Sequence, residues 1–210
     1  FLFNFVVAGS AIYYFTYIAL DKDLNNFYIL ITNIFCVIGS YLAKILAKKF
    51  SSRNTAIAMF FIMAVVMVVA NFTYTNVALV IALMSLAQLG YGMAYSLTPA
   101  LYADTIIYSE WKTGKNATGW ISGLQNVPLK LGVLARGIVI TACLAIANFS
   151  AETVDLANVP VELEHAICMA FMIVPAIALV VAGLLLLFGF RLTKEKVIQY
   201  QNEIEARKAA

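Results

Sequence analysis

Long apolar segments dominate this sequence and restrict what the chain can fold into. They cover residues 1–20, 27–47, 55–72, 77–103, 118–147 and 166–190. About 20 helical residues, each rising about 1.5 Å, cross the roughly 30 Å hydrocarbon core of a bilayer. The pattern therefore predicts an all-α membrane protein. We expect a bundle of six transmembrane helices over residues 1–191 and an amphipathic cytoplasmic tail over residues 192–210.

The composition excludes the main classes of soluble protein. Hydrophobic residues make up 63% of the chain and charged residues only 12%, and the net charge of +3 comes from basic residues placed between the apolar segments. That placement fits orientation in a membrane better than a nucleic-acid surface, so we expect no nucleic-acid partner. Cys36, Cys143 and Cys168 are odd in number and widely spaced, which argues against a disulfide framework or a cysteine metal site.

The charged residues predict the orientation of the helices. Loops on one side carry Lys22 among the acidic residues Asp21, Asp23, Glu152, Asp155, Glu162 and Glu164. The loops on the other side hold eleven basic residues: Lys44, Lys48, Lys49, Arg53, Lys112, Lys115, Arg191, Lys194, Lys196, Arg207 and Lys208. Because cytoplasmic loops are enriched in lysine and arginine, both termini are expected in the cytoplasm.

The segment over residues 118–147 is the candidate functional wall. It carries Gln125, Asn126 and Lys130 through its middle. A lysine at the centre of a membrane helix costs about 2.5–3.5 kcal/mol on an insertion scale, so such residues usually face a bundle interior or a wet cavity. Gly123, Asn126, Lys130 and Gly137 share one helical face. Arg136 lies about 9 Å further along the axis, where we expect it to extend to the outer surface.

Other polar and proline residues interrupt the apolar segments. Asn4 lies inside the first segment, where an amide needs a partner helix or water, and a cavity is one of its two possible surroundings. Pro99, Pro128 and Pro175 each leave a carbonyl one turn earlier without its helical donor, which predicts kinks or breaks. The connection over residues 103–115 is expected to be an amphipathic interfacial loop.

Two stretches in the middle of the chain resemble one transporter family. One reads Ala-Asp-Thr-Ile-Ile-Tyr-Ser-Glu-Trp-Lys-Thr-Gly from residue 103, and the other reads Ser-Gly-Leu-Gln-Asn-Val-Pro-Leu-Lys from residue 122. This order is similar to that of the glycoside, pentoside and hexuronide to cation symporters, the melibiose permease family of the major facilitator superfamily. There the pattern is Ala-Asp, then Tyr-Gly-Glu-Trp/Tyr-Lys-Thr-Gly, then Ser-x-x-Gln and a lysine five residues later. Two positions depart from it, since Ile107 replaces an acidic residue and Ser109 a glycine.

The resemblance implies roles for particular residues. The lysine matched by Lys130 lies at the cavity and is tied to coupled transport, and the aromatic residue matched by Tyr95 lines the sugar site. We also assign a gating role to five side chains of the loop over residues 103–115. The predicted substrate and cation pathway comprises Asn4, Tyr91, Tyr95, Gln125, Asn126 and Lys130. The predicted gating loop comprises Asp104, Tyr108, Glu110, Trp111 and Lys112.

The resemblance also implies what the chain is part of. It is similar to the C-terminal half of a twelve-helix transporter, so we expect a piece of a longer protein whose partners are the N-terminal six-helix half, membrane lipid and a sugar-like substrate. Na⁺ or H⁺ is the expected coupling ion, with no other cofactor, and the expected location is the bacterial inner membrane. A symporter of lipid or another organic solute is the alternative. An enzyme is disfavoured, because the sequence has no HExxH or GxSxG motif and a single histidine.

Overall fold

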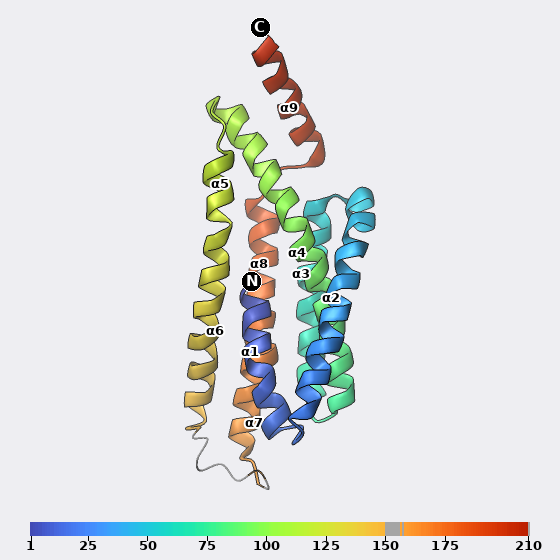
Figure 1. Cartoon of the computed structure of the whole chain (residues 1–210), viewed down its shortest axis with the longest axis vertical. Helices are drawn as coiled ribbons and strands as arrows, with labels where there is room; N and C mark the ends of the chain where they lie inside the picture. The colour runs from blue at the N-terminus through green and yellow to red at the C-terminus, as the bar shows by residue number, and fades with distance from the viewer. Residues whose placement is uncertain (150–155, 157, 210) are drawn as a thin grey trace.

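The described part of the chain is a helical bundle. The computed structural model describes residues 1–149, 156 and 158–209, and the regular elements in these residues are all helices. Most of the helices run side by side along one long axis (Figure 1). In chain order they are α1 (Leu2–Tyr17), α2 (Asp23–Phe50), α3 (Ser52–Phe72), α4 (Val77–Thr113), α5 (Thr118–Leu124), α6 (Asn126–Ile146), α7 (Val161–Cys168), the π-helix η1 (Met169–Ile173), α8 (Val174–Gly189) and α9 (Lys194–Ala209).

Five helical stretches are long and apolar enough to cross a membrane, so the chain is a multi-pass integral membrane protein. They are α2, α3, α4, the pair α5 and α6, and the series α7, η1 and α8. Each of the six predicted segments lies largely in helix, and the first contains the shorter apolar helix α1. Helix α1 has 16 residues and measures about 24 Å, less than the hydrocarbon core. It ends because the chain turns at residues 18–22, where Leu20 has a φ of 55°.

Local sequence signals set the helix boundaries. Ser51 is the N-cap of α3 and accepts a hydrogen bond from the backbone N–H of Asn54, and Asn76 caps α4 in the same way through Leu79. The predicted loop over residues 103–115 is instead the last part of α4. It contains no glycine or proline before Gly114, which ends the helix in the left-handed conformation at a φ of 69°.

The prolines affect the helices in three different ways. Helix α4 continues through Pro99 without a break. The segment over residues 118–147 is divided at Gln125, one residue after the carbonyl that Pro128 was predicted to free, so that break is confirmed. The π-helix η1 ends two residues before Pro175 and accommodates the missing donor of that proline. The last span is therefore locally irregular at that level of the bundle.

The helices pack through a core of large side chains and through close backbone contacts. Tyr14, Phe15, Met63 and Phe171 are fully buried in this core. Helices α2 and α4 approach each other at Gly39 and Gly92. A β-carbon at Gly39 would overlap the carbonyl oxygen of Leu89, and one at Gly92 would overlap that of Cys36. Small residues at a helix interface allow this backbone approach in a membrane.

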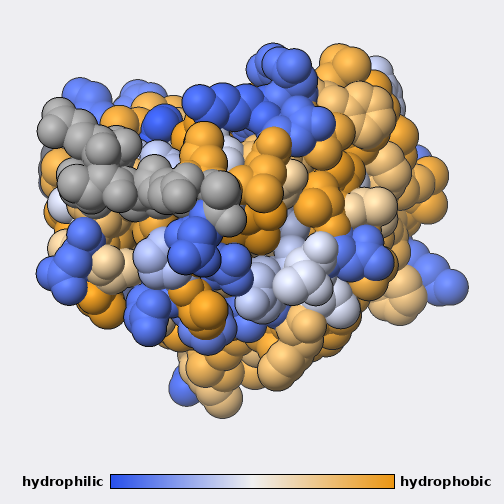
Figure 2. Space-filling view, turned by 90° about the horizontal axis from the view of Figure 1, so that it is seen from below, coloured by the Kyte–Doolittle hydropathy of each residue, from blue (hydrophilic) through white to orange (hydrophobic). Residues whose placement is uncertain are grey.

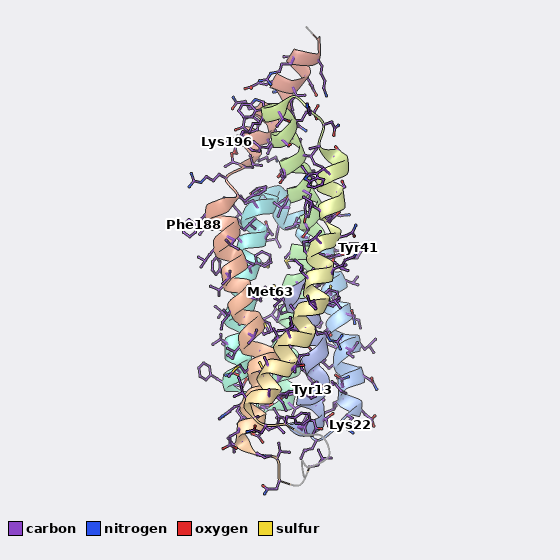
Figure 3. All side chains as sticks on the ribbon, turned by 90° about the vertical axis from the view of Figure 1, so that its left-hand side faces the viewer. Tyr13, Lys22, Tyr41, Met63, Phe188 and Lys196 are labelled. Carbon is purple, nitrogen blue, oxygen red and sulfur yellow. The ribbon has the colours of Figure 1, made fainter. Side chains whose placement is uncertain are left out.

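The two ends of the bundle differ in charge as predicted for the described residues. Lys22 lies at one end and Lys196 at the other (Figure 3). The α2–α3, α4–α5 and α8–α9 connections share the end that is uppermost in Figure 1, so the eleven basic residues gather there; we call it the basic end. Figure 2 views the opposite end, where hydrophilic side chains lie among apolar ones. Glu152 and Asp155 lie outside the described residues.

Candidate functional site

A polar contact joins the first and fourth helices inside the apolar part of the bundle. The side-chain amide of Gln88 on α4 donates to Oδ1 of Asn4 on α1 at 3.0 Å, and the pair is partly buried. Two amides that satisfy each other in this way avoid the cost of an unpaired polar group in hydrocarbon. Asn4 therefore has a partner helix, and its partner Gln88 is a residue that the predicted pathway left out.

Four aromatic rings lie next to that amide pair and form a cluster that we call the aromatic wall. The ring centroids of Phe3 and Tyr91 lie 5.6 Å apart, those of Tyr91 and Tyr95 lie 5.8 Å apart, and those of Phe1 and Tyr95 lie 5.9 Å apart. These separations are typical of favourable aromatic pairs. Phe3 is buried, whereas 51% of Tyr95 is exposed. The aromatic wall thus exposes one tyrosine, Tyr95, which has an apolar ring and a polar hydroxyl.

Helix α6 packs on α1 through one of its faces. Gly132 is buried there, and a β-carbon added to it would come within 2.9 Å of Cδ2 of Phe5. One turn further along, the side chain of Arg136 lies over Gly9 of α1. The absent side chain of Gly9 leaves room for Cδ and Nε of Arg136 against α1, while the arginine as a whole is exposed. Its extension to the outer surface stays a prediction.

The opposite face of α5 and α6 has no partner within the described chain. Asn126 and Lys130 are exposed on this face. Gly123 and Gly137 lie on it as well, and a β-carbon added to either would meet no atom within 4 Å. Gln125 is half exposed at the break between the two helices. The ion pair present among the described residues joins Lys208 and Glu110, so Lys130 has no carboxylate partner in this part of the chain.

Phe1 connects the aromatic wall to the level of Lys130. Its ring contacts Tyr95 on α4, and its β-carbon would lie 3.2 Å from a β-carbon built on Gly132 of α6. Lys130 precedes Gly132 by two residues, or about 3 Å along the helix axis. The structure therefore brings Tyr91, Tyr95 and Asn4 together and sets Lys130 at a similar height on a neighbouring helix. Lys130 itself points away from α1, since two residues turn an α-helix by about 200°.

The predicted gating residues form a different cluster, at the basic end. The indole of Trp111 stacks on Tyr200 of α9 with centroids 4.2 Å apart, and the ring of Tyr108 lies 6.1 Å from that of Trp111. Glu110 pairs with Lys208 at 2.7 Å. Lys112 lies over the ring of Tyr108, with Nζ 5.8 Å from its centroid. Asp104 is separate from this cluster and lines a cavity at the same end.

Helix α9 supplies partners that the sequence prediction missed. The indole N–H of Trp111 donates to a carboxylate oxygen of Glu203 at 2.5 Å, and Arg207 donates to the backbone carbonyl of Trp111 at 3.0 Å. The signal was present in the spacing, because Tyr200, Glu203 and Arg207 are three and seven residues apart on one helical face. Thr193 caps α9, since its Oγ1 accepts from the N–H of Lys196 at 3.5 Å. The tail packs on the end of α4.

The attachment of α9 to α4 is expected to weaken in acid. The hydrogen bond from Trp111, followed by one from Gln199, lowers the pKa of Glu203. A carboxylate whose pKa is lowered on folding contributes stability above its ordinary pKa of about 4.3 and loses it as the pH falls through the lowered value. Trp111 emission should therefore change below about pH 4 in a Trp120→Phe background, which leaves one tryptophan.

Two matched variants test this acid response. Glu203→Gln should reduce the change in Trp111 emission, because the titrating oxygen is gone while an acceptor remains. Glu205→Gln alters an exposed carboxylate on the same helix and should leave the response as it is. An undiminished response in Glu203→Gln would contradict the assignment.

The chain is similar in sequence to known transport proteins. Residues 1–194 match the family model described as MFS/sugar transport protein. An uncharacterized symporter of Bacillus subtilis is 26% identical over 88% of this chain and 40% of its own length. A glucuronide carrier protein homolog of Escherichia coli is 26% identical over 98% of this chain and 44% of its own length. An isoprimeverose transporter of Lactiplantibacillus pentosus is 26% identical over 84% of this chain and 36% of its own length.

These matches cover only part of each relative. The chain spans less than half the length of each of these relatives. No solved structure is a significant match. The family match covers nearly the whole bundle, and the relatives are named as a symporter, a glucuronide carrier homolog and an isoprimeverose transporter. The chain belongs to the MFS/sugar transport protein family, among the glycoside, pentoside and hexuronide to cation symporters of the major facilitator superfamily.

Proposed function

We propose that this chain is the C-terminal half of a cation-coupled transporter for sugars or glycosides, working by alternating access around a cavity in the middle of the membrane. The observation that carries the proposal is the open face of α5 and α6. It sets Lys130 and Asn126 on a membrane helix with no partner in the described chain and with two uncovered glycines beside them. Ionisable groups at such positions commonly serve substrate or ion pathways.

The proposed substrate class is supported by the relatives and by the chemistry of the aromatic wall and of α5 and α6. One relative is named as a glucuronide carrier homolog and another as an isoprimeverose transporter. Tyr95 offers an exposed ring and hydroxyl, and Gln125 and Asn126 offer amide donors and acceptors, which suit a hydroxyl-rich ligand. Lys130 adds a cation for a carboxylate or a hydroxyl. These features favour a sugar or glycoside over the lipid substrate considered as the alternative.

The same face implies a partner. An N-terminal six-helix half of the transporter would cover Asn126, Lys130 and the open glycines and would form the second wall of the cavity. Two related six-helix repeats with the binding site at their interface are typical of this superfamily. Small residues on the uncovered face let the opposing helices come close and slide past it. We expect this chain without its partner half not to accumulate substrate.

The coupling ion is proposed to be Na⁺ or H⁺, held with carboxylates of the partner half. Asp104 of α4 lines the cavity at the basic end together with Lys44 and Lys48. It is nine residues beyond Tyr95, about 14 Å along the helix. A cation site near Lys130 therefore needs acidic groups from the other wall, which would also stabilise the lysine ammonium.

We further propose that the basic end faces the cytoplasm, with both termini on that side of a bacterial inner membrane. The eleven basic residues of that end support this orientation. In a cysteine-free background, Lys22→Cys should react with a membrane-impermeant maleimide in intact cells, whereas Lys48→Cys and Lys115→Cys should react only after the membrane is permeabilised. All three positions are exposed in the bundle. Labelling at position 48 but not at position 22 in intact cells would reverse the orientation.

Exchange uptake tests the substrate class. The complete transporter, reconstituted in liposomes loaded with a candidate substrate, would be given trace radiolabelled glucuronide, neutral glycoside or lysophospholipid. We expect saturable exchange for at least one glycoside and none for the lipid. Tyr95→Ala should raise the half-saturating concentration about tenfold, the loss expected for one aromatic contact of about 1.5 kcal/mol. Exchange of the lipid alone would overturn the proposed substrate.

A further inference from the structure

A cavity at the basic end is lined by cations from three helices. Its volume is about 560 Å³, and Lys44 and Lys48 of α2, Arg53 of α3 and Lys194 of α9 lie in its wall. One carboxylate, that of Asp104, lies in the same wall. An adjoining cavity of about 450 Å³ shares three of these four cations and adds Lys49 and Glu195. Basic groups therefore outnumber acidic groups in both spaces.

These cations are not neutralised by ion pairs within the described residues. The ion pair found there joins Lys208 and Glu110, away from the cavity wall. Arg53 is held in place by donating from Nε to the carbonyl of Phe190 at 2.5 Å and from Nη2 to the carbonyl of Leu187 at 2.7 Å. Its charge is thereby fixed at the end of α8 without meeting a carboxylate. Four positive charges facing one negative charge create a strong field for an anion.

The backbone adds to this field. Ser51 and Ser52 line the cavity at the point where α3 begins. The first N–H groups of a helix have no partner within the helix, and the helix dipole places partial positive charge there. The hydroxyl of Ser52 is a further donor in the wall. Phosphate oxygens accept hydrogen bonds of both kinds, together with charge-assisted bonds from lysine.

Much of the remaining cavity wall is apolar, and exposed apolar side chains lie near it on α2. Leu97, Ala100, Val197 and Ile198 line the cavity beside the charged groups. On α2, one to two turns before Lys48, Tyr41 is 69% exposed and Ile45 is 67% exposed. Exposed apolar side chains at this position are suited to contact with acyl chains. A headgroup in the cavity could thus remain joined to chains that lie along α2.

We propose that this cavity binds a phosphate-bearing anion, and that the headgroup of an anionic phospholipid is the source that its position favours. The ligand would bridge α2, α3 and α9, and so tie the tail helix to the α2–α3 turn. Basic pockets between membrane helices recognise anionic headgroups through this combination of charge and apolar contact. The residues that line it include neither Lys130 nor a ring of the aromatic wall, so it is additional to the transport pathway proposed above.

Lipid titration tests this site in the complete protein, purified in an uncharged detergent. Fluorescent-tailed phosphatidylglycerol would be titrated and then displaced with unlabelled phosphatidylglycerol, phosphatidylcholine or inorganic phosphate. The Lys44→Gln/Lys48→Gln double variant removes two charges of the cavity. Its matched control, Lys112→Gln/Lys115→Gln, removes two charges at the same end but outside both cavities. We expect the first to weaken binding about twenty-five-fold, at about fivefold for each lysine, and the second to change it little.

The outcomes separate the possible sources of the phosphate. Displacement by unlabelled phosphatidylglycerol but not by phosphatidylcholine supports a lipid headgroup, and the charge-retaining Lys44→Arg/Lys48→Arg variant should then restore most of the affinity. Displacement by millimolar inorganic phosphate that is also lost in the Gln double variant supports a soluble phosphate in the same site. Equal weakening in the two Gln double variants, or equal displacement by both lipids, would overturn the proposal.

Discussion

Replacing Lys130 with alanine in the complete transporter is expected to abolish uphill accumulation of its substrate. The ammonium group lies exposed on an uncovered face of α6, close in height to Tyr95. If it contacts a substrate oxygen or a carboxylate of the opposing half, its removal costs about 1.5–3 kcal/mol, the value of a hydrogen bond to a charged group. That loss corresponds to a reduction in coupled uptake of about ten- to a hundredfold. Initial uptake rates and surface expression would be measured together.

Three further variants define what Lys130 contributes. Lys130→Gln should fail like alanine, since it lacks the charge. Lys130→Arg should fail as well, because a planar guanidinium does not replace a compact ammonium. Lys22→Ala, at an exposed turn far from the wall, is the control and should retain uptake. Near-normal accumulation by Lys130→Ala at equal expression would remove this residue from the mechanism.

A second large effect is expected from Gly92. A β-carbon at this position would overlap the carbonyl oxygen of Cys36, which belongs to the backbone of α2 and cannot rotate away. The hydroxyl of Ser40 also donates to the carbonyl of Gly92 at 3.2 Å across this interface. Separating α2 from α4 would disturb both contacts. Gly92→Ala should therefore lower the stability of the bundle by about 3 kcal/mol, the upper part of the range for overpacking.

The control for Gly92 uses another helical glycine. Gly119 on α5 is exposed, and a β-carbon added there would meet nothing within 4 Å. Gly119→Ala should be neutral or stabilising, by up to about 1 kcal/mol, because alanine is the better helix former. Thermal unfolding of the two variants in the same detergent gives the comparison. A Gly92→Ala variant as stable as Gly119→Ala would show that the α2–α4 contact is looser than the structure has it.

The sequence predicted most of the helices and one face of the site for clear physical reasons. Apolar segments of about 20 residues can satisfy their backbone groups in lipid only as helices, so the membrane class followed directly. Helical spacing predicted that Asn126, Lys130 and Gly137 share one face. Asn126 and Lys130 are exposed, and no atom lies within 4 Å of a β-carbon built on Gly137. The break near Pro128 followed from its missing N–H. Each of these properties depends on residues close together in the chain.

Properties that depend on distant residues were not predictable in the same way. The fourth helix was expected to end near residue 103, with the apolar segment, yet it continues through polar residues until Gly114 ends it. The position of Arg136 depends on Gly9 of another helix. The stacking of Trp111 on Tyr200 joins residues 89 positions apart. Local periodicity describes a helix face, but it does not identify which other helix that face contacts.

Accumulation against a gradient is the most direct test of the proposed function. The complete transporter would be reconstituted in liposomes with equal substrate inside and outside, and a gradient of Na⁺ or H⁺ would then be imposed. We predict that one of these gradients drives the glycoside to a higher concentration inside, and that the matching ionophore abolishes the accumulation. Equilibration of the sugar without accumulation under either gradient, at a rate equal to that without a gradient, would contradict cation-coupled transport.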